Sequence, residues 1–215
     1  MSDLNFNDLT SNLQEIGKDA ILGMKARNLL TTFDLFIIGM INRNLSLIEA
    51  VSYLHSQKNL IAVIPLLRIV LDSNLRLIGV FHCSDPFVYI EYFTKGESIR
   101  KLKSKDGQRL TDSYLVKKFS EMYPDSEDLY KKASGFVHYS NSLLWRVIKP
   151  AEELEEDETG YMVKIGIGKE FVILNEEDWV NINKTFIDLI DIFNLICKKY
   201  QTFLDVIFKE NSASA

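Results

Sequence analysis

Residues 59–81 restrict the fold of this chain more than any other segment. Leu, Ile, Val and Ala fill most positions, and the only charged side chains are Arg68, Asp72 and Arg76, spaced four residues apart. A helix that is apolar on almost every side belongs inside a protein. Side chains at i, i+4 and i+8 lie nearly one above another, so these three can form a ladder. The segment therefore predicts a central helix whose charges are paired, hydrogen-bonded or open to a wet cavity.

The ladder contains two arginines and one aspartate, which leaves one surplus positive charge. A carboxylate from another helix or a bound anion can neutralise this charge. The fork geometry of Arg suits phosphate or carboxylate, which favours an anion pocket at Arg68, Asp72 and Arg76. The alternative is an ion network that only fixes the register of the helices and needs no ligand.

The rest of the chain predicts helices packed around this segment. No linker rich in Pro or Gly divides the 215 residues, so we expect one domain over 1–215. The predicted fold class is all-α, a helical bundle of about six to eight helices with one inserted β-hairpin and a long C-terminal helix. Its parts are a helical core over 24–149, an acidic loop over 150–160, the hairpin over 161–174 and the long helix over 175–209.

The C-terminal helix has the clearest pattern. Asn175 is a suitable N-cap, and apolar residues then recur three and four apart from Trp179 to Ile207. A helix of about 33 residues is roughly 50 Å long, which exceeds what a compact bundle of this size needs. Packing inside the subunit accounts for most of the stripe. The excess length also predicts a homodimer through the terminal helices.

Three further boundaries are predicted from turn and cap residues. We expect a break or frayed helix end over 17–23, a turn over 42–44 and a helix over 87–103 that Ser84 or Asp85 caps.

A second group of polar residues surrounds a histidine. Ser134, His138 and either Asn141 or Ser142 share one face of a predicted helix. The histidine is either a general acid or base, or a neutral core residue bonded to Ser134 or to a backbone carbonyl. If it faces the ladder, it could transfer protons while Arg68 stabilises charge on a phosphodiester.

These patterns define the candidate site. The candidate catalytic residues are His138, Arg68 and Arg76. The candidate ligand-binding residues are Arg68, Asp72, Arg76, Ser134, His138, Asn141 and Ser142. Three His and two Cys show no spacing typical of zinc, and no Walker loop or kinase signature is present, so no metal or other cofactor is predicted.

Charge argues against nonspecific binding of DNA, because the net charge is −5 and such binding needs clustered cations. We interpret one basic cluster as a solvated helix end and loop rather than a nucleic-acid surface; its members are Arg100, Lys101, Lys103, Lys105 and Arg109. Charges within 60–81 oppose membrane insertion. Two cysteines and no export signal at the N-terminus predict a cytoplasmic protein.

Two short motifs support a resemblance to known families. Leu66-Leu67-Arg68 followed by Asp72, and Ser134 followed by His138 and Ser140, resemble a group of uncharacterised bacterial all-helical proteins over about residues 25–150. That group is distantly similar to HEPN domains, helical bundles that often act as toxin or defence ribonucleases. Arg76 and His82 have the Arg-to-His spacing of the HEPN signature, although Leu77 replaces the usual polar residue.

Two functions follow from these observations. The first is a non-catalytic binding or interaction module, which the resemblance associates with bacterial stress or defence, with Arg68, Asp72, Arg76 and His138 as its polar pocket. Its ligand would be a small anion or RNA. The alternative is a HEPN-like, metal-independent ribonuclease that uses His138 or His82 as acid and base and Arg68 or Arg76 for the phosphate.

Overall fold

A computed structural model describes residues 6–137, 156–157, 160–161 and 176–212 of the chain. Seven α-helices and one 3-10 helix form a bundle within these residues. The elements are α1 (Phe6–Arg27), α2 (Thr32–Ser56), α3 (Leu60–His82), α4 (Pro86–Thr94), η1 (Ile99–Lys101), α5 (Asp112–Ser120), α6 (Ser126–Val137) and α8 (Glu176–Ser212). The prediction of an all-α bundle is confirmed.

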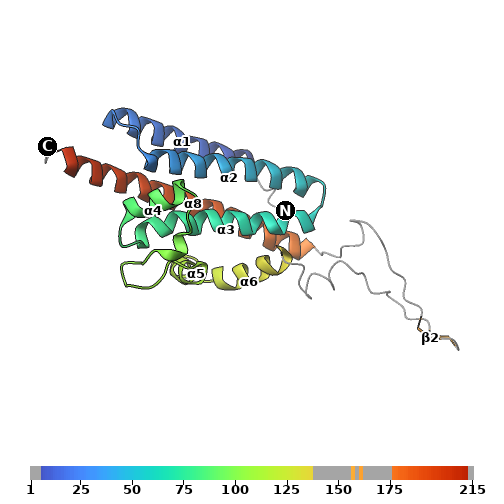
Figure 1. The fold of residues 1–215 in the computed structure, drawn as a ribbon. Helices are drawn as coiled ribbons and strands as arrows, with labels where there is room; N and C mark the ends of the chain where they lie inside the picture. The colour runs from blue at the N-terminus through green and yellow to red at the C-terminus, as the bar shows by residue number, and fades with distance from the viewer. Residues whose placement is uncertain (1–5, 138–155, 158–159, 162–175, 213–215) are drawn as a thin grey trace.

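Helix α3 is the central helix that its composition predicts. Figure 1 shows it below the α1–α2 pair and above α5 and α6, and it contacts α2, α4, α5, α6 and α8. Val70, Leu71 and Leu75 have no exposed surface. The Asn59 side chain accepts a hydrogen bond from the backbone of Ala62 and caps the helix. The three side chains of the ladder therefore project from a buried helix with a capped start.

Helix α8 is the long C-terminal helix, and its 37 residues give a length of about 55 Å. It packs along α1 and α3. Phe186, Leu189, Phe193 and Tyr200 of its apolar stripe are buried within the subunit. Intramolecular packing therefore uses the stripe.

Helices α1 and α2 run without the breaks expected over 17–23 and 42–44, so both predictions are wrong. Gly17 lies inside α1 and faces α2, where a Cβ would be 3.6 Å from the side chain of Ile41. Asn44 is buried, and its Nδ2 donates to the carbonyl of Met40 at 2.9 Å. The polar residue therefore bonds within its own helix instead of ending it.

The helix predicted over 87–103 is also shorter than expected. Asp85 caps it, as one of the two predicted alternatives, but α4 ends at Thr94. Gly96 then takes a φ of +70°, in the left-handed region that glycine enters easily. The rest of the segment forms η1 and a loop.

The predicted β-hairpin over 161–174 lies outside the described residues, apart from Tyr161. The described strands are β1 (Glu156–Asp157) and β2 (Gly160–Tyr161), which pair antiparallel. Glu156, Asp157 and Gly160 fall in the segment predicted as an acidic loop, and Tyr161 is the first residue of the predicted hairpin.

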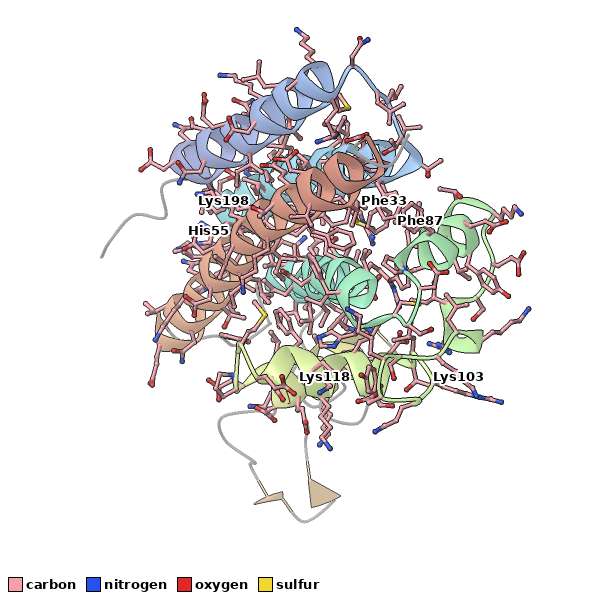
Figure 2. The ribbon with its side chains drawn as sticks, turned by 90° about the vertical axis from the view of Figure 1, so that its left-hand side faces the viewer. Phe33, His55, Phe87, Lys103, Lys118 and Lys198 are labelled. Carbon is pink, nitrogen blue, oxygen red and sulfur yellow. The ribbon has the colours of Figure 1, made fainter. Side chains whose placement is uncertain are left out.

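Three charged side chains join the ends of α1, α2 and α8, and we call them the clamp: Arg27, Asp34 and Asp205. Arg27 donates to Asp34 at 2.5 Å and to Asp205 at 2.9 Å. Asp34 also accepts from the backbone and hydroxyl of Thr31, which caps α2. Aromatic rings pack nearby, and Figure 2 shows Phe33 and Phe87 at this end of the molecule. Their ring centroids are 5.1 Å apart.

Helix α2 is long and apolar enough to cross a membrane, and it is the one such helix among the described residues. Only 39% of its most apolar 18-residue window is buried in the bundle.

Candidate functional site

The ladder forms along α3 as its spacing predicts. Asp72 Oδ1 is 3.6 Å from Nη1 of Arg68 and 3.0 Å from Nη2 of Arg76. These side chains are only partly exposed, so solvent screens the interactions less than at an open surface. Asp72 therefore holds the two arginines on the same side of the central helix.

A second carboxylate comes from another helix, which is one of the two ways expected to neutralise the ladder. Asp112, the first residue of α5, accepts from Arg76 Nη2 at 2.8 Å. Its other oxygen accepts from Arg100. The result is a continuous row of alternating charges from Arg68 through Asp72, Arg76 and Asp112 to Arg100.

The pKa of Asp112 reflects these contacts. Burial alone would raise the pKa of this carboxyl, but the hydrogen bond and charge of Arg76, together with Arg100, hold it below its ordinary value. Burial would likewise lower the pKa of Arg76, and the charges of Asp72 and Asp112 raise it instead. Both groups are therefore ionised at neutral pH.

Helix α6 closes the other end of the row. Arg68 Nε donates to Ser134 Oγ at 3.3 Å, and the guanidinium carbon lies 4.0 Å from the centre of the Tyr130 ring. That distance is typical of a cation–π contact. Arg68 is therefore held in place by a carboxylate, a hydroxyl and an aromatic face.

An open cleft with a volume of about 480 Å³ lies along this row. Three arginines line it: Arg43 from α2, Arg68 and Arg100. Asp72 and Asp112 contribute polar wall, and Pro65, Ile69, Tyr130 and Ser134 complete the lining. We call this cavity the arginine cleft.

The charges around the arginine cleft do not balance. Arg43, Arg68, Arg76 and Arg100 face only two carboxylates, Asp72 and Asp112, which leaves two surplus positive charges among the described residues. Arg43 is exposed and has no ion-pair partner within the described part of the chain. The cleft is therefore electropositive in a protein whose net charge is −5.

The structure brings together only some of the predicted site residues. Arg68, Asp72 and Ser134 line the arginine cleft, and Arg76 supports it through the two aspartates. The remaining predicted residues, His138, Asn141 and Ser142, lie outside the described residues.

His82 is not among the residues that line the arginine cleft. It lies at the end of α3, where its ring centre is 6.3 Å from that of Tyr114. Burial lowers the pKa of His82, and the charge of Lys118 lowers it further. Arg76 pairs with Asp72 and Asp112. The contacts of Arg76 and His82 therefore do not bring these two residues together at the cleft.

Four lining or supporting residues were missed by sequence reasoning: Arg43, Arg100, Asp112 and Tyr130. Arg100 belongs to the basic cluster interpreted as solvated; its side chain is 62% exposed, and it also pairs with Asp112. The signal available in the sequence was the surplus charge of the ladder, which required another carboxylate without specifying which one.

Within the described residues, no group of three or more His, Cys, Asp or Glu side chains could hold a metal ion. No protein-family model matches the chain, and no curated protein or solved structure is significantly similar to it.

Proposed function

We propose that this protein is a non-catalytic binding module that holds a small anion in the arginine cleft. Guanidinium groups would bind the anion through charge-assisted hydrogen bonds. Pro65, Ile69 and Tyr130 give the same cavity an apolar wall that could contact an organic part of the ligand.

One observation carries the proposal: three arginines line an open cavity, and together with Arg76 they outnumber the neighbouring carboxylates of Asp72 and Asp112 by two among the described residues. A network that only fixed helix register would be expected to exclude water. Arg68 and Arg76 are instead partly exposed, and Arg43 extends the charge beyond the ion pairs. An anion would supply the missing negative charge.

The HEPN-like ribonuclease is a second candidate, favoured by one contact. Ser134 begins the Ser-x-x-x-His motif, and its Oγ accepts a hydrogen bond from Arg68 Nε at 3.3 Å, which puts the last turn of α6 beside the ladder. His138 follows α6 directly in the sequence. This candidate needs His138 within reach of an anion that Arg68 binds.

Binding is tested by isothermal titration calorimetry with inorganic pyrophosphate. Arg43→Gln removes a cation that has no described ion pair, so the fold should be retained. Losing a charge-assisted hydrogen bond should weaken affinity about tenfold. Arg109→Gln is the matched control, because Arg109 is exposed but does not line the cleft. Absence of binding by the wild type, or equal weakening by both variants, would contradict the proposal.

Catalysis is tested by incubating labelled RNA with the wild type and with His138→Ala. The binding module predicts no cleavage by either protein. The ribonuclease predicts cleavage that needs no metal and is lost in His138→Ala. Equal cleavage by both would rule out His138 as the acid or base.

A further inference from the structure

The two carboxylates that line the arginine cleft differ in how their oxygens are used. Asp112 accepts from Arg76 with one oxygen and from Arg100 with the other. Asp72 faces Arg68 and Arg76 with Oδ1 alone. Its Oδ2 accepts no hydrogen bond from the described residues, and its side chain is 23% exposed at the wall of the cleft. This cationic cleft therefore offers a ligand one carboxylate oxygen as an acceptor.

Hydrogen-bond donors lie beside this acceptor. Arg68 donates through Nε to Ser134, and its Nη1 is 3.6 Å from Asp72, so its Nη2 has no partner within the described part of the chain. Arg43, which lines the same cavity, has no ion pair there either. A ligand in the cleft would thus meet guanidinium donors and a carboxylate acceptor next to each other.

The free oxygen of Asp72 limits which anions fit the cleft well. An anion that carries only acceptors would bind the arginines but leave this oxygen without a donor. A hydroxyl group can donate to it in a charge-assisted hydrogen bond. An ammonium group could also donate, but the arginines around the cleft outnumber the carboxylates by two among the described residues and would repel it. A neutral hydroxyl therefore suits this position.

The same excess of positive charge indicates how much negative charge the ligand carries. A phosphate monoester has about two negative charges at neutral pH, whereas a diester has only about one. Pro65, Ile69 and Tyr130 give the cleft an apolar wall for a carbon skeleton, and the volume of about 480 Å³ is that of a small-molecule site. Charge and size together favour a small organic monoester.

We propose that the ligand of the arginine cleft is the phosphate monoester of a small polyol, the class that includes sugar phosphates and glycerol phosphate. Its phosphate binds Arg43 and Arg68, and a neighbouring hydroxyl donates to Oδ2 of Asp72. This inference rests on the proposed function, because it names the class of anion that the same cleft holds. Asp72 then has two roles: Oδ1 positions the arginines, and Oδ2 selects ligands that carry a hydroxyl.

Isothermal titration calorimetry with two matched phosphates tests the role of the hydroxyl. Glycerol 3-phosphate and n-propyl phosphate have the same carbon chain and the same phosphate, and they differ only in hydroxyl groups. The wild type should bind glycerol 3-phosphate about tenfold more tightly, as expected for one hydrogen bond to a charged group. Asp72→Ala should bind the two compounds equally, because the acceptor is gone while Arg43 and Arg68 still bind the phosphate.

Asp112→Ala is the matched control. It removes the same charge from the same row of ion pairs, but both oxygens of Asp112 are already bound to arginines. The affinities for the two phosphates should therefore change together, and the preference for glycerol 3-phosphate should persist. Circular dichroism melts establish that both variants remain folded.

The outcomes separate this inference from the proposed function. Equal affinity of the wild type for the two monoesters, or binding of pyrophosphate but of neither monoester, would overturn the inference and leave the anion site in place. A preference that persists in Asp72→Ala, or that also disappears in Asp112→Ala, would overturn it too. Binding of none of the three compounds would overturn the proposed function itself. Flotation with phosphatidylglycerol vesicles, without binding of glycerol 3-phosphate, would overturn the monoester in favour of a lipid headgroup.

Discussion

The clamp and the ladder are both networks of arginine and aspartate ion pairs, but they differ in charge balance and in exposure. In the clamp, one arginine binds two aspartates, so the negative charge is in excess and Asp34 is only 2% exposed. In the row of charges along α3, arginines outnumber aspartates and line an open cleft.

The two networks also differ in sequence separation. The clamp joins residues 178 positions apart and fixes the ends of three helices. The ladder lies mostly within one helix, which already holds its own geometry. The positive charge on the ladder is therefore not needed to close the fold, and the proposed anion would bind to it.

The largest effect is expected in the clamp. Asp34→Ala removes the partner of a nearly buried guanidinium and also the cap contacts with Thr31. Arg27 keeps only the half-exposed Asp205, so losing its buried partner together with the helix cap should lower the free energy of unfolding by about 3–5 kcal/mol. Urea unfolding followed by circular dichroism measures the loss. Asp205→Ala is the control, because Asp205 is 48% exposed and should cost at most about 1 kcal/mol. Equal losses in both variants would contradict a buried clamp.

A smaller loss is expected at the centre of the ladder. Arg76→Met removes the contacts to Asp72 and Asp112 but leaves each carboxylate a second arginine, Arg68 or Arg100. The free energy of unfolding should therefore fall by about 2 kcal/mol. Arg68→Met should cost about 1 kcal/mol, since its ion pair is longer. Urea unfolding of both variants gives the comparison, and a loss larger than that of Asp34→Ala would reverse the order proposed for the two networks.

The same contrast explains how much of the fold and site the sequence could predict. The four-residue spacing of Arg68, Asp72 and Arg76 is visible in the sequence, and so is the apolar stripe of α8. Each is a local pattern within one helix. Arg27, Asp34 and Asp205 have no such spacing, because the clamp exists only after three helices have packed.

The residues that line the cleft could not be predicted from the sequence, because they too meet only after the helices have packed. Arg43, Asp112 and Tyr130 come from α2, α5 and α6, and only the arrangement of the bundle brings them beside Arg68. The missed continuity of α2 has a different cause. Asn44 has the residue type of a turn, but burial gives its amide a bond to Met40 within the helix.

The ladder should also lose stability in acid. Burial would raise the pKa of the Asp112 carboxyl, but Arg76 holds this pKa below the ordinary value of an aspartate. The ionised Asp112 therefore stabilises the fold at neutral pH. This contribution is present above about pH 4, the ordinary pKa of aspartate, and is lost as the pH falls through the lower folded-state value. Asp112→Asn should be less stable than the wild type by about 1–2 kcal/mol at pH 7, with the difference shrinking below pH 4.

Urea unfolding of both proteins at a series of pH values measures this effect. Asp128→Asn is the control, because Asp128 pairs with Lys132 in an exposed position and should change stability little at any pH. A difference between wild type and Asp112→Asn that stays constant down to the lowest pH would contradict the assignment to the carboxyl of Asp112.

The smallest expected effect is the stabilisation of the fold by a bound ligand. It should separate the two networks most sharply, because only the arginine cleft is proposed to bind the ligand. Pyrophosphate at ten times its dissociation constant should stabilise the wild type by about 1.4 kcal/mol, which corresponds to a melting temperature higher by roughly 3–5 °C. Asp34→Ala should melt at a lower temperature yet gain the same increment, because the clamp does not line the arginine cleft. Arg43→Gln should melt like the wild type without ligand and gain much less with it. An increment lost in Asp34→Ala and kept in Arg43→Gln would place the anion at the wrong end of the bundle for the proposed site.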